Sequence, residues 1–475
     1  VGMLRQHGRG HACRLLTGRP AYHFLGSGSW SAYRFLCSSV PEPPLPSAED
    51  ALLDRTGSIS PDVDPFSSRK LQGRGGVFRG KDVVPMWIAD MDFRCAAPII
   101  DAVVACAARG IYGYTNPPDA LIEHTLRRLS EVYGSPPPQS EWISWLPGLV
   151  PALNHAVRVC QPAAAPGLLP PPTGVVVLTP AYPPFLHAPR NFGARLIEVP
   201  LQPRALPSAG EVQFEIDWAR LEAELSDPTT RLLLLCNPHN PTGRVWPEGE
   251  LARLATLCVA HDVTLCSDEV WGEVPLDAPR APFTSALALL EGGGASAPVA
   301  GLRERLIVLT SPSKCFNVAT LNLAISVVPH APLRHALRAA GADMAEVTPF
   351  GYFGASAAYG DPEAEAWRQR LLVYLRANRD HAVRTLSAVP GVRVTVPESS
   401  YLLWVDAAGA LPRVRRERRE PTSTQHEHAH RARTRTHTAG CAHTRHALTR
   451  RASHTQWPPR CAHRMVLTWP RARLP

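Results

Sequence analysis

Short apolar runs alternate along the chain with longer segments of helical periodicity. Runs rich in leucine or β-branched residues predict strands at 175–178, 195–199, 231–235, 263–267, 305–309 and 323–328. The periodic segments predict helices at 98–109, 118–133, 149–160, 217–225, 247–260, 331–340 and 362–388. Proline or glycine stands at nearly every junction between them. This alternation predicts an α/β fold, with a mostly parallel sheet covered by helices.

The size and composition of the chain fit a folded enzyme. It has 475 residues, of which 45% are hydrophobic and 19% are charged, enough for two or three domains. No apolar run reaches the length of about 18 residues that a membrane-spanning helix needs, so we expect no membrane partner.

The 11 cysteines include no Cys-x-x-Cys pair, and several stand in apolar runs. They predict buried, reduced thiols in an intracellular protein rather than a disulfide framework.

The net charge of +9 is concentrated at the two ends of the chain. Residues 1–41 hold five arginines and no acidic residue, and residues 413–475 hold 15 arginines and three glutamates. The segment between them therefore carries a net negative charge. This distribution excludes a general basic surface, and we expect no nucleic-acid partner for the folded body.

The N-terminal segment reads as a leader rather than as part of the core. Residues 1–45 combine an acid-free, arginine- and serine-bearing stretch with a proline-rich linker, which is typical of a mitochondrial or plastid transit peptide. An untranslated stretch or an inexact gene start fits the same residues equally well, in which case the protein would be cytoplasmic. Residues 46–97 are expected to form an N-terminal arm.

The C-terminal segment 407–475 is rich in arginine and histidine and shows no apolar periodicity. We expect it to be disordered, most simply because it is translated noncoding or frame-shifted sequence. A zinc site and an arginine-rich RNA-binding tail are weaker alternatives. The zinc site would use the repeated Cys-x-His pairs Cys441, His443, Cys461 and His463, whose spacing matches no common finger, so no metal is predicted.

Four unusual segments follow predicted strands. They are TPAYPPF at 179–185, CNPHNPTG at 236–243, SDEVW at 267–271 and TSPSKCFN at 310–317. Ligands of open α/β sheets bind at the carboxyl ends of the strands, so we expect these segments to meet at one sheet edge. There they would bring together an aromatic ring, an amide, a carboxylate and a lysine.

Each of these side chains has an ordinary explanation when it is taken alone. Lys314 would be a surface cation, Asp268 a helix cap, Asn240 a turn residue and Tyr182 a packing residue. Together they fit pyridoxal 5'-phosphate, with the lysine for its aldehyde, the aspartate for its ring nitrogen, the asparagine for its ring hydroxyl and the tyrosine for its ring face. A turn at Gly148 that leads into a helix could supply backbone donors to the phosphate, with hydroxyls from Ser311 and Ser313, although a plain glycine turn fits as well.

The same segments resemble the class I/II aminotransferase superfamily of fold-type I pyridoxal-phosphate enzymes. Within it, they are most similar to the MalY/PatB branch of cystathionine β-lyases, or cysteine-S-conjugate β-lyases. The resemblance covers about residues 82–406. Its more specific marks are VPMWIADMDF at 84–93, GIYGYT at 110–115, SPSKCFN at 311–317 and ESSYLLWVD at 398–406.

The resemblance implies a fold and a set of roles. It implies a large cofactor-binding domain at 98–330 and a smaller α+β domain at 331–406 that is truncated at its end. Lys314 would carry the cofactor as a Schiff base, while Gly148 and Leu149 would hold the phosphate with Ser311 and Ser313. Tyr114 would reach the phosphate of a neighbouring subunit, which implies a homodimer with shared sites.

The resemblance also implies an activity. It is β-elimination on cystathionine or related cysteine conjugates, giving a thiol, pyruvate and ammonia. An aminotransferase is the alternative with the same cofactor, and a cofactor-binding protein of little activity is the third reading. That third reading is motivated by one departure from the family: no counterpart of its substrate-carboxylate arginine is expected after Asp406. A second departure is Trp271, which replaces a polar residue beside the cofactor.

Overall fold

The computed structural model describes residues 86–410, apart from 92, 137, 163–171, 292–295 and 343–344, together with the backbone of 464–468. The predicted leader at 1–45, most of the predicted arm and the Cys-x-His pairs lie outside the described residues. No helix in the described part is both long enough and apolar enough to span a bilayer.

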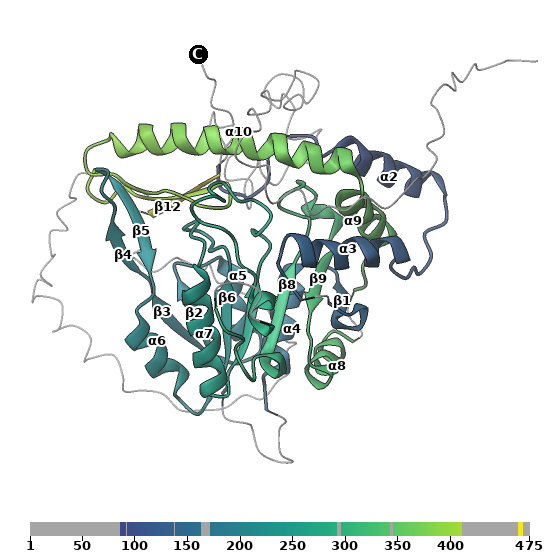
Figure 1. The fold of residues 1–475 in the computed structure, drawn as a ribbon, viewed down its shortest axis with the longest axis horizontal. Helices are drawn as coiled ribbons and strands as arrows, with labels where there is room; N and C mark the ends of the chain where they lie inside the picture. Colours follow the sequence, from purple (N-terminus) through teal and green to yellow (C-terminus); the bar gives the residue numbers. More distant parts are fainter. Residues whose placement is uncertain are drawn as a thin grey trace, which may run out of the picture. The chain divides into compact units, whose positions relative to one another are not determined.

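A seven-stranded sheet forms the centre of the fold, in the order β1-β9-β8-β7-β6-β2-β3 (Figure 1). Strands β2, β3, β6, β7 and β8 run parallel to one another, whereas β9 is antiparallel to both β8 and β1. The predicted α/β fold with a mostly parallel sheet is therefore confirmed. The strands are β1 (Ile143–Leu146), β2 (Gly174–Thr179), β3 (Arg195–Pro200), β6 (Thr230–Cys236), β7 (Thr264–Asp268), β8 (Leu306–Thr310) and β9 (Ala324–Val327).

Helices cover this sheet and bury its central strands. All five residues of β8 are buried, as are all but one of β6, because a parallel sheet covered on both faces leaves no polar side. Each covering helix contacts strands or a neighbouring helix within the main core cluster. These helices are α4 (Leu149–Val159), α5 (Pro183–Asn191), α6 (Trp218–Leu225), α7 (Glu248–Ala260) and α8 (Ala331–Ala340).

A second group of helices packs beside the sheet. The long helix α10 contacts α2, α9 and β10, and so connects this helix group to the smaller sheet (Figure 1). The group comprises α2 (Ala97–Ala108), α3 (Asp119–Glu131), α9 (Pro349–Gly360) and α10 (Pro362–Ser387). Short 3-10 turns are η4 (Ser140–Trp142), η5 (Ala286–Leu290), η6 (Arg303–Arg305) and η7 (Ala319–Leu321).

The smaller sheet has the order β12-β11-β10-β5-β4. Its strands are β4 (Gln202–Ala205), β5 (Glu211–Glu215), β10 (Arg393–Thr395), β11 (Leu402–Asp406) and β12 (Arg464–Thr468). The β4–β5 hairpin comes from within the predicted large domain, and β5 pairs with β10 in parallel. The second sheet is therefore built from segments on both sides of the predicted boundary at 330/331.

Strand β12 corrects the prediction for the C-terminal segment. It pairs antiparallel with β11, from Leu402 opposite Thr468 to Asp406 opposite Arg464. The expectation that 407–475 is disordered throughout is wrong at 464–468. The short run Met-Val-Leu-Thr after Arg464 suits a strand, but the arginine- and histidine-rich sequence around it obscured that signal. Residues 411–463 and 469–475 lie outside the described residues.

Candidate active site

The sheet order brings the four predicted segments to one edge. Strands β8, β7, β6 and β2 are consecutive neighbours and run parallel, so their carboxyl ends lie side by side. Three strand spacings separate the first from the last, a span of about 14 Å. Lys314 follows β8, Asp268 ends β7, Asn240 follows β6 and Tyr182 follows β2. The predicted convergence at one edge therefore agrees with the topology.

Lys314 lies half-buried in the turn after β8. Its Nζ donates a 3.0 Å hydrogen bond to the carbonyl oxygen of Ala89 and lies 5.6 Å from the centre of the Trp271 ring. Burial lowers the pKa of the lysine, while the carboxylates of Asp90 and Asp268 act in the opposite direction. A lowered pKa increases the fraction of neutral amine, which is the form that attacks an aldehyde or removes a proton.

Asp268 is 4% exposed and ends β7. Its Oδ1 accepts a 3.2 Å hydrogen bond from the backbone N–H of Val270. Burial raises the pKa of this carboxyl to about 7, although the Val270 N–H and the charge of Lys314 lower it. A buried carboxylate with so little compensation would be stabilised by a cation placed against it.

Asn317 connects the lysine turn to the segment that precedes α2. Its side-chain Nδ2 donates to the carbonyl oxygens of Met91 and Phe93, at 3.1 and 2.8 Å, and its Oδ1 accepts from the N–H of Met91 at 3.0 Å. These three bonds bring Ala89 against Lys314. The motif MWIADMDF, which marked only the family resemblance, is therefore a direct neighbour of SPSKCFN, the motif that carries Lys314.

The turn after β6 lies against the end of β7. The N–H of Asn237 donates to the carbonyl oxygen of Asp268 at 2.8 Å, and the N–H of Gly243 closes the turn on the carbonyl oxygen of His239 at 2.7 Å. Asn240 is half-buried within this turn. Tyr182, which is 41% exposed, precedes α5 on the next strand along. The turn that carries Asn240 thus lies against the end of β7, and Tyr182 follows the neighbouring strand β2.

The predicted phosphate residues lie at two places. Gly148 caps α4 with a φ of +123°, and this N-cap residue gives no side-chain hydrogen bond to the first N–H groups of the helix, which begins at Leu149. Ser311 is buried, and its hydroxyl donates to the carbonyl oxygen of Leu323 at 2.7 Å while accepting from the N–H of Ser313 at 3.1 Å. The α4 start thus has backbone donors available to an anion, whereas the Ser311 proton is directed at the chain itself.

Sequence reasoning gave no role to Tyr401 or Asp90. The Tyr401 hydroxyl donates to the carbonyl oxygen of Ala89 at 3.3 Å, and its ring meets the Trp271 ring edge-on at 4.8 Å. Asp90 acts on the pKa of both Lys314 and Tyr401. Both residues lie inside motifs used only to identify the family. Trp271, whose polar counterpart was noted as missing, is 1% exposed and lies beside Lys314.

Tyr114 lies at the surface of the single chain. It is 99% exposed, and Ile111 and Tyr112 of the same segment are 81% and 58% exposed. The single chain therefore does not bury Tyr114 in the site around Lys314. An exposed apolar stretch of this kind is typical of a protein–protein interface.

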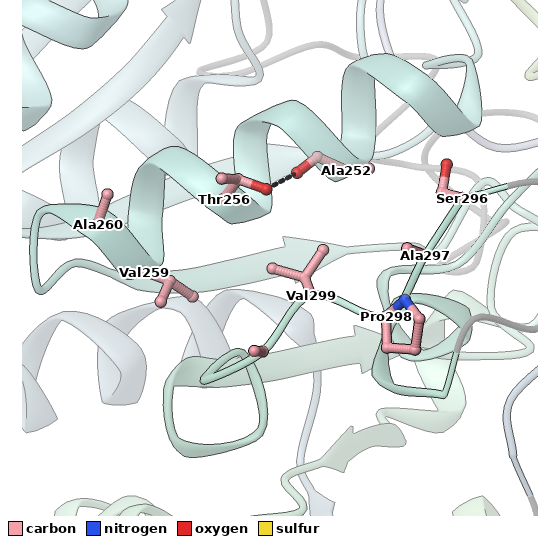
Figure 2. Close-up of a pocket in the computed structure, with 9 residues that line it drawn as sticks. Ala252, Thr256, Val259, Ala260, Ser296, Ala297, Pro298 and Val299 are labelled. Atoms are coloured by element: carbon pink, nitrogen blue, oxygen red, sulfur yellow. Dashed lines mark hydrogen bonds between the residues drawn. The ribbon is translucent and has the colours of Figure 1, made fainter.

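A surface pocket of about 470 Å³ lies beside α7 (Figure 2). Its lining consists of small apolar and hydroxyl side chains from α7 and from residues 296–300. It contains no titratable side chain and none of the predicted site residues. We therefore place the candidate active site at the sheet edge.

The residues at the sheet edge fit pyridoxal phosphate. Lys314 offers an amine of lowered pKa for the aldehyde, and Asp268 offers a buried carboxylate for a protonated ring nitrogen. The uncapped start of α4 at Gly148 offers backbone N–H groups for the phosphate. These three features match the three charged or reactive ends of the cofactor.

Comparisons with known proteins agree with this reading. The family model for aminotransferase class I and II matches residues 155–439. Cystathionine beta-lyase PatB of Bacillus subtilis (strain 168) is 32% identical over 349 residues, which cover 71% of this chain and 81% of that protein. Protein MalY of Escherichia coli (strain K12) is 28% identical over 338 residues, which cover 69% of this chain and 78% of that protein.

A solved structure extends the comparison to the fold. The crystal structure of cystalysin from Treponema denticola, which contains a pyridoxal 5'-phosphate cofactor, is similar with a TM-score of 0.60 and 26% identity, covering 69% of this chain and 77% of that one. The predicted family, its resemblance to the MalY/PatB branch and the fold class are thus confirmed. The chain belongs to the aminotransferase class I and II family.

Proposed function

We propose that this protein is a pyridoxal-phosphate-dependent carbon–sulfur β-lyase that acts on cystathionine or related cysteine conjugates. The observation that carries the proposal is that Lys314, an amine of lowered pKa, and the buried carboxylate of Asp268 lie at one sheet edge, where the charge of each acts on the pKa of the other. Similarity to PatB and MalY supports the choice of this branch. With cystathionine the overall reaction consumes one water and yields homocysteine, pyruvate and ammonia.

The proposal assigns a separate role to each group of residues at the site. Pyridoxal phosphate, when bound, supplies an aldehyde for amino groups and a ring that withdraws electrons from the substrate Cα. In our proposal Lys314 would hold the cofactor, and its free amine would take the substrate Cα proton at Nζ. Asp268 keeps a proton on the ring nitrogen by placing a negative charge beside it. Asn240, Tyr182, Gly148, Leu149, Ser311 and Ser313 are proposed to orient the ring and the phosphate.

An aminotransferase is the second candidate, and the matching family model favours it as a class. The two reactions differ in what they need. Elimination from cystathionine releases pyruvate without any added keto acid, whereas transamination consumes one keto acid for each amino acid converted. Pyruvate formed from cystathionine alone, measured with lactate dehydrogenase and NADH, supports the lyase. Strict dependence on an added keto acid would reject it.

The third candidate is a cofactor-binding protein of little activity. It rested on the absence of a substrate-carboxylate arginine after Asp406, and β12 weakens that argument because it places Arg464 at the start of a strand of the smaller sheet. Arg464→Gln tests the point. If Arg464 binds the substrate carboxylate, KM rises and cofactor binding stays unchanged. If the wild-type protein binds the cofactor but no amino acid changes its visible spectrum, the third candidate is the better account.

We also propose a homodimer. The exposed segment with Ile111, Tyr112 and Tyr114 is the surface that supports it. In this arrangement Tyr114 reaches the phosphate site of the neighbouring subunit, so each site needs residues of both chains. Sedimentation equilibrium of the purified protein should give twice the chain mass.

A further inference from the structure

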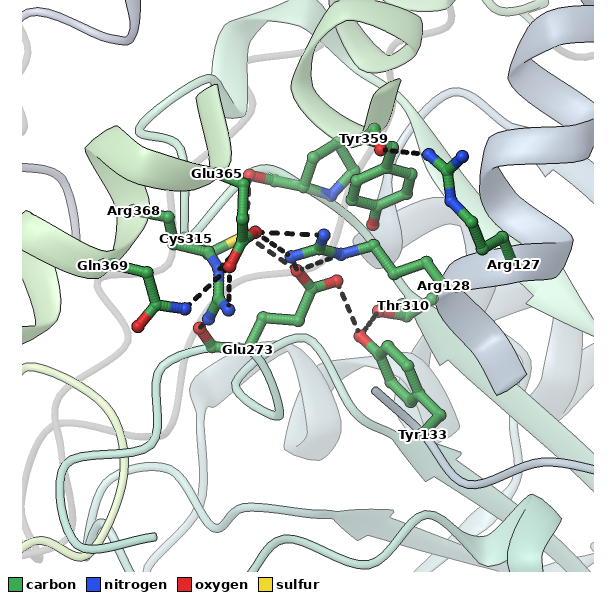
Figure 3. A network of polar contacts seen from close by, with 11 residues as sticks. Arg127, Arg128, Tyr133, Glu273, Thr310, Cys315, Tyr359, Glu365, Arg368 and Gln369 are labelled. Carbon is green, nitrogen blue, oxygen red and sulfur yellow. Dashed lines mark hydrogen bonds and ion pairs between the residues drawn. The ribbon is translucent and has the colours of Figure 1, made fainter. Parts of the chain in front are cut away.

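Glu273 lies at the centre of a buried polar network that touches the lysine turn (Figure 3). We call it the Glu273 network. It joins helix α3, the loop after Asp268, the turn that carries Lys314 and helix α10. Its members are Arg128, Tyr133, Glu273, Thr310, Cys315, Glu365 and Arg368.

The carboxylate of Glu273 is almost fully enclosed, with 1% of its side chain exposed. Its Oε2 accepts from Arg128 Nε at 2.7 Å and is approached by the thiol of Cys315 at 3.6 Å. Its Oε1 accepts from the Tyr133 hydroxyl at 3.1 Å. Burial and the neighbouring Glu273 charge both raise the pKa of the Tyr133 hydroxyl and the Cys315 thiol, which keeps both groups protonated as donors.

These contacts hold both ends of the lysine turn. Thr310 is the last residue of β8, and its hydroxyl lies 2.6 Å from the Tyr133 hydroxyl. Cys315 follows Lys314 directly. The network therefore brackets residues 311–314. Glu273 itself stands five residues after Asp268, so one side chain connects the lysine turn to the loop that begins at Asp268.

Helix α10 completes the network. Arg368 NH1 donates to the backbone carbonyl oxygen of Glu273 at 2.8 Å, and its guanidinium pairs with Glu365 at 2.6 Å. Glu365 also pairs with Arg128 at 3.2 Å. Two carboxylates and two guanidinium groups thus balance in charge. Glu365 shares Arg128 with Glu273, but among the described residues its side chain bonds to α3 and α10 and not to the lysine turn.

We propose that Glu273 is a positioning residue for Lys314, fixing the turn that carries the amine relative to Asp268. The inference rests on the proposed role of Lys314. A misplacement of a reacting group by about 1 Å can cost roughly 100-fold in rate, so a rigid support for this turn has functional value. A purely structural ion pair would stabilise the fold without affecting the amine.

The test compares Glu273→Gln with the matched control Glu365→Gln in the full chain. The first readout is the rate at which trinitrobenzenesulfonate modifies Lys314 in the apoprotein, followed by peptide mass spectrometry. The second is the dissociation constant of pyridoxal phosphate. We expect Glu273→Gln to speed the modification and to weaken cofactor binding, each by roughly 10-fold. Glu365→Gln should lower the melting temperature while leaving both readouts within about 2-fold of wild type.

Equal effects of the two substitutions on both readouts would overturn the inference, because the network would then be only structural. If Glu273→Gln does not fold, Cys315→Ala and Cys315→Ser decide. Serine keeps a donor to Glu273 and should resemble wild type, whereas alanine should change Lys314 reactivity in the direction given above. No difference between these two variants also overturns it.

The wild-type protein separates this inference from the proposed function. Failure of wild-type Lys314 to form a borohydride-reducible adduct with pyridoxal phosphate would reject the proposed function. The reactivity of Lys314 in the apoprotein variants does not depend on that adduct. It therefore still decides whether Glu273 positions the amine.

Discussion

The Nζ of Lys314 donates a 3.0 Å hydrogen bond to the carbonyl oxygen of Ala89, a residue 225 positions earlier in the chain. The segment around Ala89 therefore lines the candidate site beside Lys314. Asn317 holds this segment in place with three hydrogen bonds to Met91 and Phe93. One short stretch of sequence, 314–317, thus carries the amine and also the side chain that binds the Ala89 segment beside it.

Asn317→Ala should release the segment around Ala89 from the turn that carries Lys314. The loss of three hydrogen bonds, one from a backbone N–H, should destabilise the segment locally by about 2–3 kcal/mol. We expect hydrogen–deuterium exchange at the Met91 amide to become roughly 30-fold faster or more, with α7 amides unchanged. Asn154→Ala is the control, since the Asn154 side chain bonds the carbonyl oxygen of Val150 in α4 and the side chain of Asn191 in α5. Unchanged exchange at Met91 in Asn317→Ala would show that other contacts hold the segment.

Asp268→Asn should change the pH dependence of apoprotein stability. Burial raises the folded pKa of Asp268 from 3.8 to about 7, so the folded state binds the proton more tightly than the unfolded state. Stability therefore falls as pH rises from about 4 to 7, and the full cost of the buried charge is present above that range. Asparagine removes this cost, and the variant apoprotein should be more stable at pH 8 by on the order of 2–4 kcal/mol.

Burial also raises the pKa of Glu269 to about 7, so its titration lowers the stability over the same pH range. Glu269 is present in both proteins and therefore contributes equally to both. Urea unfolding of the apoproteins at pH 5 and pH 8 measures the difference between them. The gain should be larger at pH 8. In the loaded enzyme the same substitution should lower kcat by roughly 100-fold or more. A gain that is equal at both pH values would contradict the assignment of this titration to Asp268.

Gly243→Ala should be more harmful than its backbone angle alone implies. Gly243 has a φ of +72°, and an added Cβ would overlap Pro397 in the segment before β11. Gly193 is the matched control, because its φ is +67° and no heavy atom would lie within 4 Å of an added Cβ. Gly193→Ala should cost about 1 kcal/mol, from backbone strain, and Gly243→Ala about 3 kcal/mol or more. Equal losses in urea unfolding would show that the two segments separate easily.

Shared sites predict complementation between inactive subunits. Lys314→Ala and Tyr114→Ala should each lose most activity as homodimers, Lys314 because it is the reacting amine and Tyr114 through weaker phosphate binding. A mixed dimer keeps one site with both residues intact. Mixing the two variants under conditions that exchange subunits should restore activity, up to about a quarter of the wild-type value for random pairing. No recovery, with exchange verified by mass spectrometry, would argue against shared sites.

The large sheet and the location of its functional edge could be predicted because buried parallel strands are continuous apolar runs. All six predicted strands occur, with no end shifted by more than one residue. Helix α5 could not be predicted because Pro183, Pro184 and Pro189 argue against a helix. In the structure the first two occupy the opening positions, where no N–H bond is lost.

The supports of the site could not be predicted from spacing. Asn317, Tyr401 and Glu273 act through partners more than 100 residues away in the chain, and only the tertiary fold brings these groups together. The predicted residues Lys314, Asp268 and Asn240 differ in this respect. Each follows or ends a parallel strand, so the sheet topology alone determines the edge at which it lies.

The identity of the lysine that binds the cofactor tests the account most directly. The chain has three lysines, Lys70, Lys81 and Lys314, so the assignment is unambiguous. The protein should be loaded with pyridoxal phosphate, reduced with borohydride, digested and analysed by mass spectrometry. The account predicts a phosphopyridoxyl group on the peptide that contains Lys314 and its loss in Lys314→Ala. Labelling of Lys70 or Lys81 instead, or no reducible adduct at all, would contradict it.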